Sequence, residues 1–319
     1  MPTVIENAVA LLRQGELVAF PTETVYGLGA DAANADAVAK IFAAKGRPAD
    51  HPLIVHLPCH DQLDLWARDV PPAAYELAEA FWPGPLTLIL KRQPNVIDAV
   101  TGGQDTVGLR VPGHPLALEL LRAFGGGVAA PSANRFGRIS PTAAQHVRDD
   151  LGGSVAMVID GGACSVGIES TIVDLSGAAL TILRPGMIVA ADIGRVLGRV
   201  PSDARVDAPR VSGSLEAHYA PRTPLSLLPA DAVIFAVREA LAKNERLAVL
   251  APMLCPISDD LIVWLAAPSD PGPFAHALYA NLRALDALGC ARIVVQKPPA
   301  SQAWSAIADR LQRAAAGSG

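Results

Sequence analysis

The segment Lys45–His56, with the sequence KGRPADHPLIVH, contains the strongest candidates for chemistry. Gly46 and Pro48 make the backbone turn sharply between a helix and a strand, and this turn fixes two cations close together. A compact ammonium beside a planar guanidinium suits a polyphosphate. For an isolated pair, the commoner explanation is a helix end whose cations offset the helix dipole. The neighbouring motifs favour phosphate binding.

Five further motifs place hydroxyl residues, glycines or an arginine at the ends of predicted strands, where open α/β sheets bind ligands. They are PTETVYGLGAD (Pro21–Asp31), WPGPLTLIL (Trp82–Leu90), VGLRVPGHP (Val107–Pro115), APSANRFGRISPT (Ala130–Thr142) and ESTIVD (Glu169–Asp174).

Several of these side chains have ordinary structural explanations as well. Arg110 offers a two-bond grip on a carboxylate, whereas a surface ion pair is the alternative. Ser132 and Asn134 can donate to phosphate oxygens, although a turn explains the same residues. Thr22 can simply satisfy backbone groups, and a histidine on an apolar strand, such as His56, is usually a core residue.

Elements that alternate between helix and strand position these motifs. A capping box at Thr3 predicts a helix that ends near Gly15. Further helices are predicted from about Asn34 to Gly46, over Pro72–Phe81 and over Pro115–Phe124, and Thr22–Asp31 reads as a polar loop. Three strand-like runs follow one another after residue 150, so we predict an α/β fold with a twisted mixed sheet.

A proline-rich segment divides the chain. We expect a first domain over residues 1–199, a linker over 200–224 and a smaller Rossmann-like α/β domain over 225–319. No G-x-G-x-x-G follows the first strand of the second domain, so no dinucleotide fingerprint accompanies that fold.

Composition excludes several classes of protein. The 319 residues are 51% hydrophobic, and the net charge of −5 argues against broad binding to nucleic acid. The four cysteines are isolated, which suggests neither disulfides nor a zinc site. No apolar run reaches the ~20 residues of a membrane helix, so we expect a cytoplasmic protein without membrane contact.

Taken together, the ordered motifs PTET, YGLG, KGRP, RVP, PSAN and STIVD resemble the threonylcarbamoyl-AMP synthase family over residues 5–198. The linker, with His218-Tyr219-Ala220-Pro221, and the C-terminal domain resemble the long form of that family. The resemblance implies a YrdC-like domain followed by a Rossmann-like domain.

The resemblance also implies roles for individual residues. It implies that L-threonine is bound by Thr24, His56, Arg110, Ala130 (through its backbone) and Ser170. It implies that ATP is bound by Arg47, His51, Thr106, Ser132, Ser140, Arg184 and Tyr219. Lys45 and Arg47 are the predicted catalytic residues at the triphosphate.

The implied reaction joins L-threonine, bicarbonate or CO2, and ATP into threonylcarbamoyl-AMP, which serves threonylcarbamoyladenosine formation in tRNA next to the anticodon. A tRNA threonylcarbamoyl transferase complex is the expected downstream partner, and no stable tRNA binding is expected. Mg²⁺ is expected with ATP, without a metal site built by the protein.

Two other functions remain open from the sequence. An RNA-binding module is disfavoured by the acidity and the scarcity of aromatic residues. The carbamoyl-transfer segment of hydrogenase maturation proteins shares the implied fold, but those proteins carry cysteine pairs that are absent here. We also predict that the linker folds over the first domain when ATP and threonine bind, which would slow proteolysis at Arg205, Arg210 and Arg222. The alternative is a flexible tether that makes no contact with the first domain.

Overall fold

The computed structural model describes residues 3–202, 208–257 and 259–318, and the chain divides into two compact units. The first unit comprises Met1–Phe136, Pro141–Ser165 and Glu169–Ser214. The second comprises Gly137–Ser140, Val166–Ile168 and Leu215–Gly319. The predicted linker therefore belongs to both units: its residues up to Ser214 are part of the first unit, and those from Leu215 onward are part of the second. Arg205 lies outside the described residues.

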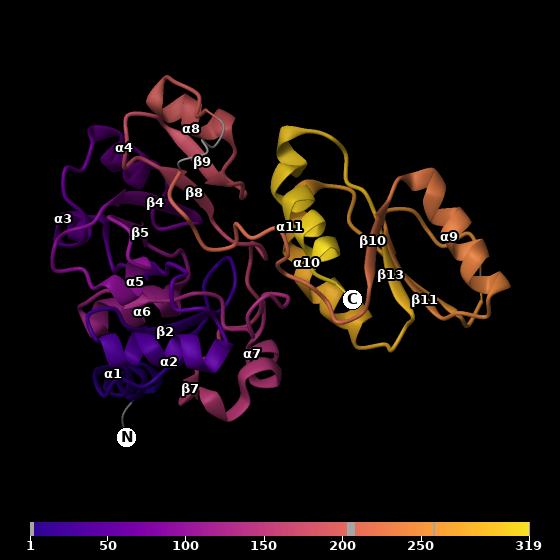
Figure 1. The fold of residues 1–319 in the computed structure, drawn as a ribbon, viewed down its shortest axis with the longest axis horizontal. Helices are drawn as coiled ribbons and strands as arrows, with labels where there is room; N and C mark the ends of the chain where they lie inside the picture. The colour runs from indigo at the N-terminus through magenta and orange to yellow at the C-terminus, as the bar shows by residue number, and fades with distance from the viewer. Residues whose placement is uncertain (1–2, 203–207, 258, 319) are drawn as a thin grey trace. The chain divides into compact units, whose positions relative to one another are not determined.

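A nine-stranded mixed sheet forms the first unit (Figure 1). Its strands are β1 (Val18–Phe20), β2 (Gly27–Asp31), β3 (Ile54–His56), β4 (Leu86–Lys91), β5 (Thr106–Arg110), β6 (Val128–Ala129), β7 (Met157–Val158), β8 (Thr171–Asp174) and β9 (Thr181–Arg184). Their order is β7-β1-β2-β6-β3-β5-β4-β8-β9. The sheet contains parallel pairs such as β3 with β5 and antiparallel pairs such as β4 with β5, which confirms the predicted mixed sheet.

The helices of this unit include several that begin or end at a local sequence signal. They are α1 (Val4–Arg13), α2 (Ala35–Lys45), α3 (Leu63–Trp66), α4 (Pro72–Phe81), α5 (Asp98–Thr101), α6 (Pro115–Phe124), α7 (Ala144–Leu151) and α8 (Ala190–Leu197). Thr3 and Glu6 form the predicted capping box on α1. Asn34 caps α2, which ends at Gly46 in the left-handed region.

The two faces of the sheet are covered differently. Alternate strand residues such as Ala19 and Val55 pack with α2 and α4 in the largest core cluster. Their neighbours Val18 and Phe20 pack with α1 and α6 on the opposite face. Farther along that face, Ile54, Ile89 and Ile172 pack with Val211 of the segment after β9.

The predicted loop over Thr22–Asp31 is wrong in its second half, because Gly27–Asp31 forms β2 inside the sheet. A Cβ atom at Gly29 would lie only 2.9 Å from the side chains of Phe20 and Val128. Glycine is therefore needed at this position for the two side chains to pack against the strand. The glycines of this segment are typical of a turn, so the local sequence does not indicate strand β2.

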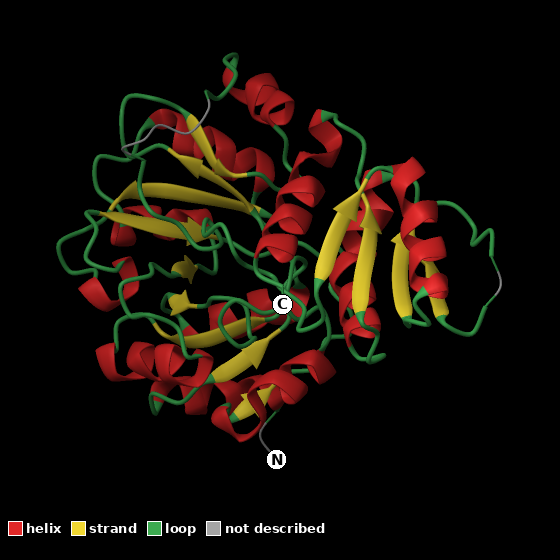
Figure 2. Ribbon diagram, turned by 45° about the vertical axis from the view of Figure 1, so that its right-hand side comes forward, coloured by secondary structure: helices red, strands yellow, loops and turns green. Residues whose placement is uncertain are grey.

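The second unit contains a parallel sheet of order β10-β13-β11-β12, which confirms the predicted smaller α/β fold (Figure 2). The elements are β10 (Leu225–Leu228), α9 (Ala230–Ala242), β11 (Leu247–Ala251), β12 (Ile262–Ala266), α10 (Pro271–Asp286), β13 (Arg292–Gln296) and α11 (Ser305–Ala316). Helix α9 packs on one face and α10 and α11 on the other. In the described part of the chain, no helix has both the length and the apolar character needed to cross a membrane.

Candidate active site

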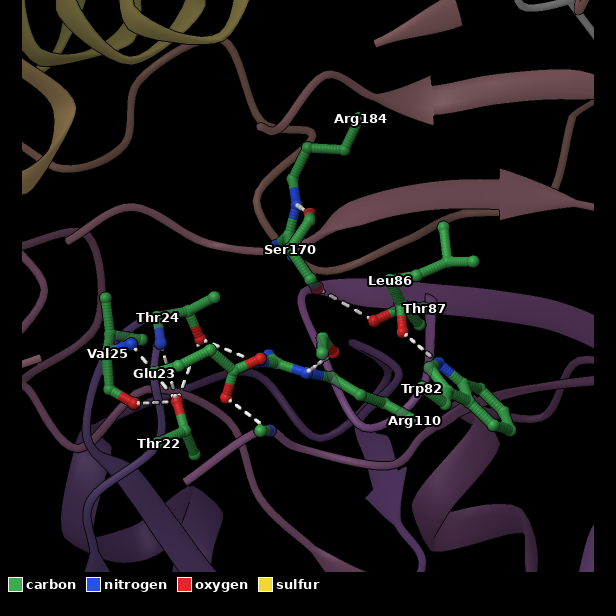
Figure 3. A network of polar contacts seen from close by, with 12 residues as sticks. Thr22, Glu23, Thr24, Val25, Trp82, Leu86, Thr87, Arg110, Ser170 and Arg184 are labelled. Atoms are coloured by element: carbon green, nitrogen blue, oxygen red, sulfur yellow. Dashed lines mark hydrogen bonds and ion pairs between the residues drawn. The ribbon is translucent and has the colours of Figure 1, made fainter. Parts of the chain in front are cut away.

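Arg110, the last residue of β5, is the centre of a buried polar network (Figure 3). Its Nη2 donates to Glu23 Oε1 at 2.6 Å and to Thr24 Oγ1 at 2.9 Å, and its Nε donates to the Gly84 carbonyl at 3.3 Å. The side chains of Arg110 and Glu23 are only 5% and 10% exposed. Strand pairing sets His56 directly beside Arg110, because the two residues are register partners at the ends of β3 and β5.

This network changes the expected grip of Arg110 on a ligand. Of the five N–H donors of a guanidinium, one on Nε and two on Nη2 are used by the protein. Among the described residues, Nη1 has no hydrogen-bond partner. A ligand carboxylate would therefore meet Nη1, and not a fork of two nitrogens.

The turn Thr22–Val25 holds the acceptors that face Arg110. Thr22 Oγ1 donates to the Val25 carbonyl at 2.6 Å and accepts from the Thr24 and Val25 backbone N–H groups. Thr22 thus satisfies backbone groups, which was the structural alternative for this residue. Glu23 Oε2 accepts from the Gly113 N–H at 2.8 Å, so the Glu23 carboxylate ties this turn to the segment after β5.

Two titratable groups beside the network are held neutral. Burial and the charge of Arg110 lower the pKa of His56 to about 3. Burial, with the Glu23 charge second, raises the pKa of the Cys164 thiol to about 12. At neutral pH the imidazole and the thiol are uncharged, which leaves the Arg110–Glu23 ion pair as the charges of this cluster.

A second hydroxyl pair lies at the start of β8. Ser170 Oγ and Thr87 Oγ1 are 2.8 Å apart, and both side chains are fully buried. Arg184 Nη2 donates to Ser170 Oγ at 3.0 Å and to the Ser170 carbonyl at 2.9 Å (Figure 3). The structure therefore brings the predicted threonine residue Ser170 and the predicted ATP residue Arg184 together.

Ser212 connects the two arginines that are predicted to contact ATP. Arg47 Nη2 donates to Ser212 Oγ at 3.2 Å and to the Pro52 carbonyl at 2.9 Å. Arg184 Nη1 donates to the Ser212 carbonyl at 2.9 Å. The linker segment thus supplies hydrogen-bond acceptors to both cations.

Lys45, a predicted catalytic residue, is bonded to two backbone carbonyls. Its Nζ donates to the carbonyls of Ser132 and Asn134, each at 2.6 Å, and the residue is 4% exposed. Burial and the charge of Arg47 lower its pKa well below the usual value, while the two carbonyl partners favour the charged ammonium. Lys45 holds the PSAN segment in place, and any contact with phosphate stays a prediction.

Three other predicted residues also belong to the first unit. Thr106 lines a pocket with Ile54, Val211 and Ser212, among others. The ring of His51 packs edge-on against Phe136, and burial lowers its pKa. The Ala130 N–H donates to the Ile54 carbonyl at 2.9 Å, which places this backbone beside β3.

The remaining two predicted residues, Ser140 and Tyr219, belong to the second unit. Tyr219 is 1% exposed and stacks on Tyr279 with ring centroids 5.7 Å apart. The Arg310 guanidinium lies 5.3 Å from the Tyr219 ring centroid. The predicted contact of Tyr219 with a nucleotide stays a prediction.

Sequence reasoning missed three residues of this site. Glu23, Thr87 and Ser212 were not predicted, although Glu23 and Thr87 lie within motifs that were noticed. An acidic residue between two threonines at a strand end was a usable signal for Glu23. Nothing local distinguishes Ser212 from other linker serines.

Comparisons of the sequence with known proteins point to one family. Residues 10–186 match a family model described as telomere recombination, and residues 188–316 match one described as threonylcarbamoyl-AMP synthase, C-terminal domain. A threonylcarbamoyl-AMP synthase of Pyrococcus abyssi is 38% identical over 97% of this chain and 93% of its own length. The chain belongs to the threonylcarbamoyl-AMP synthase family.

Other members of the threonylcarbamoyl-AMP synthase family extend this result. The Bacillus subtilis relative is 40% identical over 98% of this chain and 93% of its own length. The crystal structure of P. abyssi Sua5 complexed with L-threonine superimposes with a TM-score of 0.89 and 38% identity, covering 98% of this chain and 94% of that one. Both units of this chain therefore have counterparts in the family.

Proposed function

We propose that this chain is an L-threonylcarbamoyladenylate synthase, a nucleotidyltransferase that converts L-threonine, bicarbonate or CO2, and ATP into threonylcarbamoyl-AMP and pyrophosphate. The product is the activated donor for threonylcarbamoyladenosine formation in tRNA, next to the anticodon. The observation that carries this proposal is the buried Arg110 network, in a chain of this family.

The Arg110 end of the site suits an amino acid. Arg110 Nη1 meets the carboxylate, and Thr24, His56, Ser170 and the backbone at Ala130 surround the remainder of the substrate. The structure of P. abyssi Sua5, a relative complexed with L-threonine, supports the choice of amino acid.

The cationic end of the site suits the nucleotide. In this proposal, phosphate oxygens take over acceptor positions at Arg47 and Arg184, which Ser212 supplies in this structure. Lys45 positions the PSAN segment, so that Ser132 faces the phosphates. The proposal includes contacts of ATP with His51 and Thr106, while the contacts of Ser140 and Tyr219 with ATP stay predictions from the family resemblance.

The chemistry follows from these positions. The threonine amine and CO2 form a carbamate, whose oxygen attacks the α-phosphorus of ATP as pyrophosphate leaves. No enzyme nucleophile is needed, and the nearby Cys164 is a buried, protonated thiol. The protein contributes alignment of the two substrates and stabilisation of phosphate charge.

Mg²⁺ is part of the proposal only as a companion of the triphosphate. Within residues 3–202, 208–257 and 259–318, no three His, Cys, Asp or Glu side chains gather as metal ligands. The donors near Arg47 and Arg184 are cations and hydroxyls, which do not fit a metal cage built by the protein. We therefore assign no step to a metal held by side chains.

A direct assay tests the function. The purified protein is incubated with ATP, bicarbonate and each amino acid in turn, while pyrophosphate is measured and adenylates are identified by mass spectrometry. We expect pyrophosphate and an adenylate of threonylcarbamoyl mass with threonine only. Pyrophosphate release that ignores threonine would contradict the assignment.

The downstream steps complete the proposal. Because the adenylate is hydrolysable, a tRNA threonylcarbamoyl transferase complex is the proposed consumer, and stable binding of tRNA to this chain is not required. The cytoplasmic location stays a prediction.

A further inference from the structure

The carboxylate of Glu23 has no role in the reaction described above, yet it is buried at the centre of the site. Its Oε1 accepts from Arg110 Nη2 at 2.6 Å and its Oε2 accepts from the Gly113 N–H at 2.8 Å. Glu23 is 7% exposed. Since a carboxylate oxygen accepts two hydrogen bonds, each oxygen keeps one acceptor position.

The hydroxyl of Thr24 also presents an acceptor. Thr22 Oγ1 spends its single hydrogen on the Val25 carbonyl, at 2.6 Å. In the 2.8 Å contact between the two hydroxyls, Thr24 must therefore donate to Thr22. Having used its hydrogen, Thr24 Oγ1 accepts from Arg110 and keeps one lone pair, so it can act only as an acceptor for a ligand.

The ion pair of Arg110 and Glu23 presents one positive and one negative group side by side. Arg110 keeps the N–H groups of Nη1 for an anion, while Glu23 and Thr24 offer acceptors beside it. An α-amino acid carries an anionic carboxylate and a cationic ammonium on the same carbon. Such a zwitterion adds no net charge to a buried ion pair, so neither partner is left uncompensated.

We propose that Glu23, together with Thr24 Oγ1, binds the ammonium group of L-threonine, while Nη1 of Arg110 binds its carboxylate. This inference rests on the proposed function and adds a specificity-determining residue to it. A carboxylic acid without an amine would add a second carboxylate beside Arg110 with no second cation to balance its charge. Glu23 therefore selects for the amine, which is the group that must react with CO2.

The competing explanation gives Glu23 a purely structural role, in which it only orients Arg110. Glu23→Gln separates the two, because it keeps the size of the side chain and removes its charge. The new amide group must point a donor at either Arg110 or the Gly113 N–H, so some disturbance of Arg110 is expected. That disturbance weakens every ligand carboxylate alike, whereas loss of ammonium binding weakens only ligands that carry an amine.

The experiment compares two ligands in calorimetric titrations without ATP. L-Threonine is tested against 2,3-dihydroxybutanoate, in which a hydroxyl replaces the amine. The wild-type protein should prefer threonine, and Glu23→Gln should lose roughly 10- to 100-fold of this preference, the size expected for a hydrogen bond to a charged group. Asp105→Asn, which neutralises an exposed carboxylate that is paired with Arg68, should keep the wild-type preference.

Each outcome is decisive. Equal weakening of both ligands in Glu23→Gln overturns the proposal and leaves Glu23 as a residue that orients Arg110. If that variant does not fold, the wild-type protein decides alone: equal binding of threonine and the amine-free acid overturns the proposal. Failure of the wild-type protein to form any threonine-dependent adenylate would instead contradict the proposed function.

Discussion

The two ends of the candidate site are built from similar residue types but have different partners. At the amino acid end, Arg110 is locked by Glu23, Thr24 and the Gly84 carbonyl, all within the first unit. At the nucleotide end, Arg47 and Arg184 bond to Ser212, a residue of the proline-rich segment. The first end is preorganised by a buried ion pair, whereas Ser212 gives the second end neutral acceptors whose places phosphate oxygens can take.

This difference predicts that substitutions at the two ends act differently. A preorganised ion pair tolerates almost no change of geometry, because one displaced partner leaves a buried charge. Neutral acceptors such as those of Ser212 can be exchanged for phosphate oxygens, because their displacement leaves no buried countercharge and an anionic acceptor forms a stronger hydrogen bond with a guanidinium.

The largest effect is expected for Arg110→Lys. A lysine ammonium cannot reach Glu23, Thr24 and the Gly84 carbonyl in the directions that the planar guanidinium uses. We expect the rate constant kcat/KM for threonine to fall by roughly 10²–10³, as for loss of one preorganised electrostatic contact. Pyrophosphate release measured against threonine concentration tests this, and an unchanged threonine response would remove Arg110 from the substrate site.

Arg47→Ala should lower adenylate formation by about 10² through lost charge at the phosphates, with little change in thermal stability. The defect should appear in the ATP dependence of pyrophosphate release. Near-normal turnover would show that the nucleotide end lies elsewhere.

Lys45→Ala should differ from Arg47→Ala in stability. Removing Nζ leaves the buried carbonyls of Ser132 and Asn134 without this donor, which costs roughly 1–3 kcal/mol for each group that stays unsatisfied. Activity should fall with it, because the PSAN segment loses its anchor. Denaturant unfolding measures the difference, and a Lys45→Ala protein as stable as Arg47→Ala would contradict the anchoring role.

His56→Asn should change the pH dependence of stability. The folded-state pKa of His56, about 3, is below its ordinary value of 6.5, so protonation favours the unfolded chain as pH falls below 6.5. This group should cost the wild-type protein about 2 kcal/mol between pH 7.5 and pH 5. We expect His56→Asn to lack that loss in denaturant unfolding, whereas the exposed His60→Asn control keeps it. An unchanged pH slope in His56→Asn would show that His56 is not held neutral.

The smallest effect is expected for Ser212→Ala. Arg47 loses a hydroxyl acceptor, while Arg184 keeps the Ser212 carbonyl. Because ATP then displaces one hydrogen bond fewer, its affinity should rise by up to roughly 5-fold. ATP titration checks this, and a marked loss of affinity would show that the Ser212 hydroxyl is a nucleotide contact and not a replaceable partner.

Much of the fold could be predicted because its signals are local. The Thr3 and Glu6 capping box, the Asn34 cap and the glycine after α2 each act within one helical turn. Strand β2 was missed because its glycines are explained only by packing against Phe20 and Val128.

The sequence suggested candidate residues for the site but not how they pair with one another. Glu23 and Arg110 are 87 positions apart, and Arg47 and Ser212 are 165 positions apart, so no local pattern joins them. The position of Lys45 on a tight turn was correctly predicted, whereas the two carbonyls that receive its ammonium are brought there by the folded PSAN segment. The family resemblance identified the candidate residues, and three-dimensional packing determined their partners.

One measurement tests the central contrast most directly: calorimetric titration of L-threonine into the protein without ATP. If the amino acid end is preorganised, threonine should bind saturably without nucleotide, and Arg110→Lys should abolish that binding. Binding that appears only after ATP is added, or that is equal in wild-type protein and Arg110→Lys, would contradict the account.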